Sequence, residues 1–388
     1  MSLGQLALDC PCFLRSNIYI DQIRTNNGAI TIRKHFTFDN EAVFRRKEWA
    51  LLRTLPAGAP DVLISAIREE IVQREAMDRV SQMRRRAIAH LGWIPKVPSL
   101  LTAHGGLRAP LLVPSFAALI NAAKSGTLRL DELPQSVLKL GDGIFALGPA
   151  FSPELCAALL DDVRSFNSDQ AITRASAVAS DDLTGGVLNL RGRPNSMNQH
   201  GVLLDEIGMR PFVDALLLEC VRPIAAVLLP ESGGATLDHH RAFTVSYEAP
   251  NGSNSSSAAA SQRPRRGDTQ LGLHFDNAEV TLNVCLGERG FRGGGLRFYG
   301  DKWCQRRREQ PIEYQHKVGH AVLHAGSELH AALPLEAGCT GLRTNVVLWA
   351  RSVQHRREKG CPMCGDTRHL RFCVHDDDGN ICSMEPPQ

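Results

Sequence analysis

The chain has 388 residues, of which 43% are hydrophobic, and this is enough to build a substantial core in one or two domains. A formal net charge of +3 gives no indication of a nucleic-acid or membrane-surface protein. No run of about 18 apolar residues occurs and the N-terminus does not resemble a signal peptide, so we expect a cytoplasmic or nuclear protein without a membrane segment.

The first 140 residues are predicted to form a mostly helical region, residues 1–140. A close cysteine pair, Cys10 and Cys12, precedes an extended-looking segment. From residue 41 to residue 92, apolar side chains recur every three or four positions among many charged ones, which is typical of surface helices. Several prolines in residues 93–114 favour a linker or an irregular arm.

The character of the chain changes after residue 140. Residues 144–151 are predicted to form a strand, and Ser152-Pro153 is a good helix start because it puts a hydroxyl at the cap and proline in the first turn. Residues 167–200 are expected to be a long polar loop. Residues 208–229 are predicted to form one or two buried helices.

From Arg241 onward the sequence predicts short strands broken by glycine. Five such stretches occur, RAFTVSYEA, LGLHFDNAEVTLNVCL, GGGLRFYG, GHAVLHAG and RTNVVLWARS. Short strands at close spacing are typical of a sandwich or a jelly-roll barrel. The low-complexity segment 250–268 is predicted to be a flexible loop between two of these strands.

One strand-like stretch carries two side chains that can bind metal, His274 and Asp276. On a strand, residues two apart point to the same face, so this pair supplies two parts of a 2-His-1-carboxylate site for non-haem Fe(II). Four later histidines could complete it: His316, His320, His324 and His330. The pair alone is a weak signal, because a core histidine beside a turn-forming aspartate would look the same.

The order of the motifs around this pair resembles the 2-oxoglutarate- and iron(II)-dependent oxygenases, in the prolyl/lysyl hydroxylase branch. That branch shows H-x-D, then G-G-x-L-x-F, then a histidine with proline four residues later, then an arginine leading a final strand. This chain has HFD, GGGLRF, His330 with Pro334, and Arg343. More closely, the chain is similar to the family called 2-oxoglutarate and iron-dependent oxygenase domain-containing protein 2, also in GRPNSMNQHGVLLDEIGM and LDHHRAFTVSYEA.

The resemblance implies an α+β fold with a double-stranded β-helix (jelly-roll) oxygenase core at residues 141–352 and flanking helices. It implies that His274, Asp276 and His330 are the catalytic iron ligands, and that Arg343 binds the distal carboxylate of the cosubstrate 2-oxoglutarate. The implied activity is a dioxygenase that hydroxylates a protein side chain such as proline or lysine and releases succinate and CO₂. Ascorbate is the implied reductant.

Other residues are further candidates for the cosubstrate pocket, on weaker signals. Tyr247 matches a family position near the cosubstrate, although a core tyrosine is an equal alternative. Thr281 and Asn283 alternate with apolar neighbours and are candidates to line the cosubstrate pocket. His324 is interpreted as structural. The stretch before Arg343 is longer than in relatives, so either a longer turn absorbs it or the arginine is misplaced.

Cysteines near the chain ends suggest a second metal site. Cys361 and Cys364 have zinc-knuckle spacing and, with Cys10 and Cys12, would form a four-thiolate zinc site that joins the N-terminus to a cysteine-containing tail, residues 353–388. The rival ligands are Cys373, Cys382, His369 and His375, and free thiols are the simpler alternative.

Two functional alternatives remain beside the hydroxylase prediction. One is an oxygenase of nucleic acid or a small molecule, and the other is a non-catalytic binding module on the same barrel. A protein or peptide substrate is favoured, with loop 250–268 and the GRPNSMNQHG stretch as candidates to shape its groove. The oligomeric state is left open.

Overall fold

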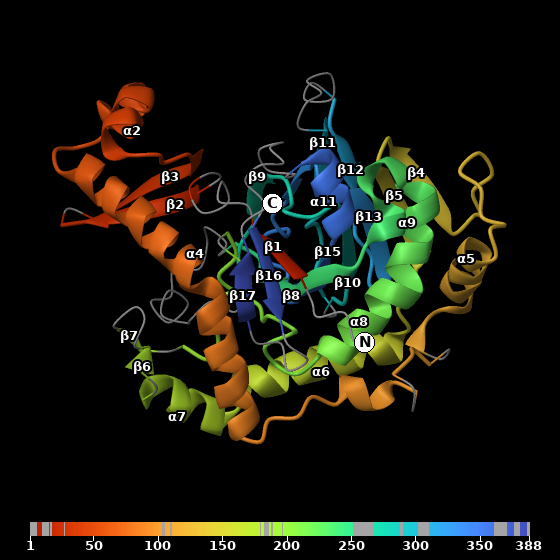
Figure 1. The fold of residues 1–388 in the computed structure, drawn as a ribbon. Helices are drawn as coiled ribbons and strands as arrows, with labels where there is room; N and C mark the ends of the chain where they lie inside the picture. Colours follow the sequence, from red (N-terminus) through yellow and green to blue (C-terminus); the bar gives the residue numbers. More distant parts are fainter. Residues whose placement is uncertain are drawn as a thin grey trace.

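The structure is a computed structural model, and it describes residues 6–9, 15, 18–26, 28–102, 105–108, 111–178, 180–181, 186–187, 189–195, 197–250, 267–287, 290–301, 310–360, 371–375 and 381–385. Two antiparallel sheets form its centre (Figure 1). The larger sheet has the order β4 (Val137–Gly141), β5 (Ile144–Pro149), β13 (His320–Ala325), β10 (Val280–Cys285), β15 (Arg343–Arg351), β8 (His239–Tyr247). The smaller sheet has the order β12 (Ile312–Tyr314), β11 (Leu296–Asp301), β14 (Glu328–Ala332), β9 (Leu271–His274).

The chain path through these two sheets is that of a jelly roll. From β8 to β15, the chain changes sheet at every connection except the one from β11 to β12. Apolar side chains of both sheets meet in one buried cluster, which includes Phe243 and Val347 from the larger sheet and Leu296 and Phe298 from the smaller. The predicted α+β class with a double-stranded β-helix core is therefore confirmed.

Helices cover the outer face of the larger sheet. They are α5 (Pro114–Lys124), α6 (Pro153–Ser168), α8 (Arg210–Ala215), the π-helical turn η3 (Leu216–Val221) and α9 (Arg222–Leu228). Their apolar faces share a second buried cluster with outward-facing strand residues such as Leu282 and Leu348. Helix α6 begins where the sequence predicts, because the Ser152 side chain accepts a hydrogen bond from the Leu155 amide at 3.2 Å.

The N-terminal unit, defined as residues 18–75, has a small core of its own. It contains a hairpin of β2 (Ile18–Thr25) and β3 (Gly28–Phe36), the helices α2 (Glu41–Lys47) and α3 (Trp49–Leu52), and the first half of α4 (Ala59–His90). Its buried cluster runs from Ile18 to Ile67. In Figure 1 this unit lies to one side of the barrel, and α4 runs from it down to the helical layer around α6 and α7.

The remaining elements are short. They are β1 (Leu6–Asp9), β6 (Ser180–Asp181), β7 (Gly186–Val187), β16 (Arg371–His375), β17 (Ile381–Glu385), α11 (Val353–Lys359), and the 3₁₀ turns η1 (Val97–Leu100), η4 (Pro230–Ser232) and η5 (Gly234–Thr236). Strand β1 pairs with β16, so strands from the two ends of the chain share one sheet. None of the described helices combines the length and apolar character that a bilayer crossing requires.

Two predictions of local structure are wrong. The expected polar loop at 167–200 contains the helix α7 (Gln170–Val178), which Asp169 caps by accepting from the Ile172 amide at 2.9 Å. The expected single strand through His274 and Asp276 is two strands, β9 and β10, with Asp276 in the connection between them. The flexible-loop prediction for 250–268 falls on residues 251–266, outside the described residues, and the domain limits at 140 and 352 stay predictions.

Candidate metal and cosubstrate site

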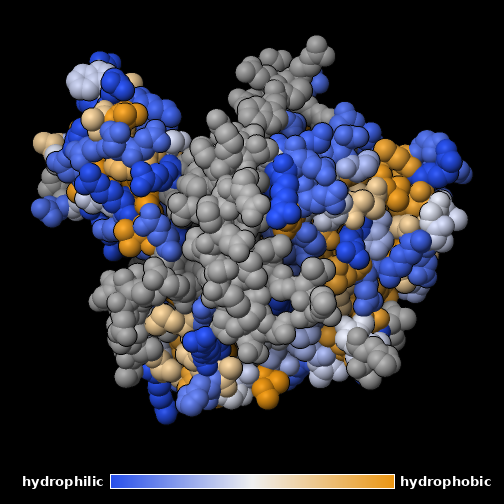
Figure 2. Space-filling view, in the orientation of Figure 1, coloured by the Kyte–Doolittle hydropathy of each residue, from blue (hydrophilic) through white to orange (hydrophobic). Residues whose placement is uncertain are grey.

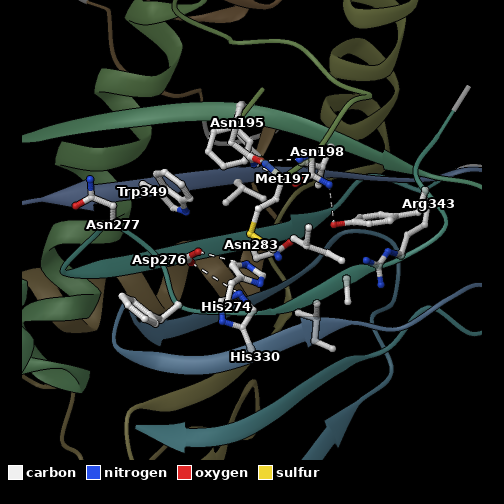
Figure 3. A pocket seen from close by; sticks show the side chains of 18 of the residues that line it. Asn195, Met197, Asn198, His274, Asp276, Asn277, Asn283, His330, Arg343 and Trp349 are labelled. Carbon is white, nitrogen blue, oxygen red and sulfur yellow. Dashed lines mark hydrogen bonds and ion pairs between the residues drawn. The ribbon is translucent and has the colours of Figure 1, made fainter. Parts of the chain in front are cut away.

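A cavity opens between the two sheets. Its lining comes from β8, β9, β10, β11, β14 and β15, with additions from α4, from the turn at 275–277, and from Asn195, Met197 and Asn198. In Figure 3 the metal-binding candidates lie in its middle, and Arg343 lies at the end opposite Asn277. The predicted site residues that line it are His274, Asp276, His330, Arg343, Tyr247 and Asn283.

Within the described part of the chain, His274, Asp276 and His330 form the one cluster with metal-binding geometry, and one ligand atom from each lies within 4.8 Å of the others. His274 ends β9 and faces His330 on the neighbouring strand β14. The Nε2 atom of His274 is 3.6 Å from Oδ1 of Asp276, and Nε2 of His330 is 3.9 Å from Oδ2. All three side chains are buried.

Asp276 reaches this cluster from a turn. Its amide donates a hydrogen bond to the carbonyl of Gly326 at 2.9 Å, which fixes the turn against the loop between β13 and β14. The predicted convergence with His274 is therefore correct, but the predicted cause, alternation along one strand, is wrong. A turn residue can aim its carboxylate at the cross-strand histidine pair without following the strand's period.

Backbone hydrogen bonds orient both imidazoles. Nδ1 of His274 donates to the carbonyl of Gly272 at 2.8 Å, and Nδ1 of His330 donates to that of Glu328 at 2.9 Å. A carbonyl only accepts, so Nδ1 of each ring carries a proton, and Nε2 of each ring faces the cluster as the ligand atom. Thr281 donates its hydroxyl to Oδ2 of Asp276 at 2.6 Å, so Oδ1 is the oxygen left for a metal.

The charge states at this cluster suit a divalent cation. Burial, helped by the neighbouring His330, lowers the pKa of His274 to about 3. Burial alone would raise the pKa of the Asp276 carboxyl, but His330 and His274 beside it outweigh burial and lower that pKa. Neutral imidazole, the form that His274 takes near neutral pH, and ionised carboxylate are the forms that bind metal.

His324 lies close to the cluster but outside it. It is the cross-strand partner of Thr281, and its Nε2 is 3.8 Å from Oδ2 of Asp276. Its Nδ1 donates to the carbonyl of Ala325 at 2.9 Å, and burial lowers its pKa to about 4. The ring also packs edge-on against Phe298. The structural interpretation of His324 stays a prediction.

Arg343 supplies the opposite charge at the far end of the cavity. It has no solvent-exposed surface, and its three guanidinium nitrogens have no hydrogen-bond partner among the described residues. The guanidinium lies 4.5 Å from the ring centre of Tyr247, its cross-strand neighbour, and burial lowers its pKa. A buried, unpaired cation is costly unless an anion joins it, so this end fits a carboxylate.

The softer candidates divide into two groups. Tyr247 and Asn283 line the cavity, where the Tyr247 hydroxyl accepts from Asn198 at 3.4 Å and Asn283 accepts from Asn345 at 2.6 Å. Burial raises the pKa of Tyr247 to about 12. Thr281 is not among the residues that line the cavity, and its hydroxyl is bonded to Asp276 behind the wall. Arg343 lies at the start of β15, directly opposite Tyr247, and it lines the cavity.

Sequence reasoning missed several lining residues. Trp349 lies on the cavity side of β15 with Arg343 and Val347, so simple alternation along that strand could have found it. Arg74 comes from α4 in the N-terminal unit, and no local pattern connects it to the barrel. Met197 belongs to the GRPNSMNQHG stretch, which was expected to shape a substrate groove.

The predicted zinc ligands Cys10, Cys12, Cys361 and Cys364 lie outside the described residues, so that site stays a prediction. The cysteines whose side chains the structure describes are free thiols: Cys156, Cys220, Cys285 and Cys339.

The chemistry of the donor set fits ferrous iron and a dicarboxylic acid. Two imidazoles and one carboxylate oxygen on one side of a centre leave the remaining coordination positions open, as non-haem Fe(II) oxygen chemistry requires. The guanidinium of Arg343, without a partner among the described residues, matches an anion bound in the same cavity. The two features together fit a metal and an anionic cosubstrate side by side.

Comparison with known proteins finds relatives that match nearly the whole chain. A family model described as OGFOD2-like domain matches residues 106–234. The chain is 30% identical to "2-oxoglutarate and iron-dependent oxygenase domain-containing protein 2" of Xenopus tropicalis, over 98% of this chain and 95% of that protein. It is 32% identical to the Homo sapiens protein of the same name, over 92% of this chain and 88% of that one.

Among solved structures, a Pseudomonas putida prolyl-4-hydroxylase matches 62% of this chain and 95% of its own, at 13% identity and a TM-score of 0.32. A Trichoplax adhaerens prolyl hydroxylase in complex with a hypoxia inducible factor peptide fragment matches 63% of this chain and 92% of its own, at 13% identity and a TM-score of 0.35. Both TM-scores are below 0.5, so neither likeness supports a conclusion about the fold or the substrate.

Proposed function

The chain belongs to the family of 2-oxoglutarate and iron-dependent oxygenase domain-containing protein 2, and from this premise we propose that it is a 2-oxoglutarate- and Fe(II)-dependent dioxygenase that hydroxylates a protein side chain. One observation carries the proposal. A single cavity holds His274, Asp276 and His330 converging in its middle and the buried guanidinium of Arg343 at one end.

Each of these side chains has a distinct role in the proposal. His274, Asp276 and His330 would hold Fe(II), and Arg343 would bind the distal carboxylate of 2-oxoglutarate. When bound, the iron would supply the oxygen chemistry. One atom of O₂ enters the succinate that forms as 2-oxoglutarate loses CO₂, and the other atom is inserted into a C–H bond of the substrate. Ascorbate would be the reductant that returns oxidised iron to the ferrous state.

The surrounding residues keep this geometry without a ligand. Thr281 holds one oxygen of Asp276, and the carbonyls of Gly272 and Glu328 fix the imidazole rings. Tyr247 lies under the guanidinium, so its ring stabilises the charge of Arg343 and limits its movement. Burial of the whole set excludes bulk water, which strengthens every charged contact in the cavity.

Succinate release tests the proposal. Purified, iron-loaded protein is expected to convert 2-oxoglutarate to succinate, at least slowly without an acceptor, while His274→Ala releases none. His320→Ala is the matched control, because His320 lies on barrel strand β13 but does not line the cavity. Mass spectrometry of cell proteins treated with the enzyme should then find proline or lysine residues that have gained one oxygen atom.

The same experiments separate the alternatives. Turnover stimulated by RNA, DNA or a metabolite instead of protein would favour a different acceptor class. Absence of iron-dependent succinate from the wild-type protein, even with candidate peptides present, would reduce the chain to a binding module on an oxygenase barrel.

A further inference from the structure

A second, wider cleft adjoins the catalytic cavity on the side of the N-terminal unit. One wall consists of the hairpin β2–β3 and a face of α4, and the other consists of residues 268–272 with part of the GRPNSMNQHG stretch. Met197 and Leu271 line both spaces, so the cleft and the cavity meet at these two side chains. In Figure 3 the Met197 side chain points into the cavity toward His274.

The two spaces differ in volume. The cleft holds about 510 Å³ of open space and the inner cavity about 60 Å³. A segment of polypeptide therefore fits the cleft, whereas the inner cavity accepts a single side chain. The N-terminal unit thus forms one wall of the cleft, and the cleft leads through the inner cavity to the metal cluster.

The charge on the cleft is negative. Its lining has four carboxylates against two guanidiniums: Asp21, Glu69, Glu70 and Asp268 against Arg33 and Arg193. Glu70 pairs with Arg193 at 2.6 Å and with Arg74, on the cavity side, at 3.1 Å, whereas Glu69 is exposed and has no ion pair among the described residues. Figure 2 shows a mostly hydrophilic surface over the N-terminal unit in this view.

A sheet edge runs along the cleft. Strand β9 ends the smaller sheet and, among the described strands, pairs only with β14. The N-terminal hairpin contacts the far end of β9, where His35 donates to the carbonyl of Leu273 at 3.1 Å. At the near end, residues 270–272 line the cleft, so the edge strand borders the space that an extended peptide would occupy.

We propose that this cleft binds an extended, lysine- or arginine-containing segment of the protein substrate, and that one side chain of that segment passes between Met197 and Leu271 to the metal cluster. The identification of the bound segment as substrate rests on the proposed function. The acidic lining favours a basic polypeptide by charge complementarity and disfavours a nucleic acid, whose phosphates would face the same carboxylates.

Fluorescence anisotropy with the full chain tests the proposal. The probes are a fluorescein-labelled lysine-rich peptide, a peptide of equal length with glutamate at the lysine positions, and a single-stranded RNA of equal length. The lysine-rich peptide is expected to bind most tightly, and its affinity is expected to fall as salt rises.

A charge-reversed pair of variants locates the binding. Glu69→Lys is expected to weaken binding of the lysine-rich peptide by about three- to tenfold, because it reverses one charge on the cleft wall. Glu75→Lys is the matched control, since Glu75 is exposed on the same helix but does not line the cleft. Both residues are on the surface, so neither change should affect folding.

The outcome is decisive in both directions. Equal affinity for the two peptides, tighter binding of RNA, or equal effects of Glu69→Lys and Glu75→Lys would overturn the proposal. Amide hydrogen exchange at residues 270–272 should slow when the lysine-rich peptide binds, and unchanged exchange there would also overturn it. Peptide binding needs neither iron nor turnover. If the wild-type protein releases no succinate but binds the lysine-rich peptide as expected, the proposed function is contradicted and the assignment of the cleft stands.

Discussion

The two ends of the cavity between the sheets differ in how completely the protein satisfies their polar atoms. At the metal end, the atoms that face away from the centre are bonded: Nδ1 of His274 and of His330 to backbone carbonyls, and Oδ2 of Asp276 to Thr281. At the arginine end, the guanidinium of Arg343 is buried with no hydrogen-bond partner among the described residues.

This difference indicates two ways of preparing a site. The metal end is held in place before any ligand arrives, so changes there should affect binding more than folding. At the arginine end a positive charge is buried without a partner, so removing that charge should weaken binding of 2-oxoglutarate and stabilise the fold. Variants at the two ends should therefore separate metal binding, cosubstrate binding and stability.

The largest effect is expected from His274→Ala. Loss of one of the three ligands leaves two, and we predict that Fe(II) no longer binds at concentrations that saturate the wild type and that succinate release stops. Metal analysis after anaerobic loading, together with thermal unfolding of the metal-free protein, measures both consequences. Full iron content in the variant would remove His274 from the ligand set.

Arg343→Met should have the next largest effect, and it should change 2-oxoglutarate affinity and fold stability in opposite directions. We expect 2-oxoglutarate affinity to fall by about 2 to 5 kcal/mol, roughly 30-fold to several thousand-fold, because a charged partner is lost from a buried pair. We expect the free energy of unfolding without ligand to rise by about 1 kcal/mol or more, because an uncompensated buried charge is removed.

Calorimetric binding of 2-oxoglutarate and denaturant unfolding measure these two quantities. Fe(II) content should be unchanged in Arg343→Met. A variant that is both less stable and able to bind 2-oxoglutarate normally would show that Arg343 serves packing and not anion binding.

Thr281→Val should weaken metal binding more moderately. The side chains have similar shape, but valine leaves Oδ2 of Asp276 without its 2.6 Å hydrogen bond. Loss of such a support typically costs about 10- to 100-fold in metal affinity. Thr281→Ser keeps the hydroxyl and should recover most of that loss in the same Fe(II) titration. Equal affinities for Thr281→Val and the wild type would mean that the backbone alone positions the carboxylate.

Tyr247→Phe should have the smallest effect. The ring stays beneath the guanidinium, and the 3.4 Å contact of the hydroxyl with Asn198 is lost. A neutral hydrogen bond contributes about 1 kcal/mol, so 2-oxoglutarate affinity should change by no more than about fivefold. A change as large as that of Arg343→Met would assign the phenol a direct contact with the cosubstrate.

Much of the barrel could be predicted from the sequence because its signals are local. Strand β10 alternates apolar and polar side chains over Val280–Asn283, and α6 begins at a serine cap followed by proline. The helix α7 was missed because it is short and rich in small and polar residues, so its apolar face, with Ile172 and Ala175, is narrow. Asp276 was assigned to a strand because sequence alone did not show that β9 ends at His274.

The least predictable features depend on contacts between distant parts of the chain. Arg74 reaches the cavity between the sheets from a helix of the N-terminal unit, and the cleft exists only because that unit lies against residues 268–272. Periodicity describes which face of an element is buried, but not which other element buries it. The motifs identified the ligands, whereas the entrance to them required the three-dimensional arrangement.

A crystal structure of the protein with Mn²⁺ in place of Fe(II), grown with 2-oxoglutarate in the absence of oxygen, tests the central claim most directly. We predict one anomalous peak bound by Nε2 of His274, Nε2 of His330 and a carboxylate oxygen of Asp276. We also predict a carboxylate of 2-oxoglutarate hydrogen-bonded to Arg343 in the same cavity. A metal bound elsewhere, or an arginine that remains unpaired while 2-oxoglutarate occupies another site, would contradict it.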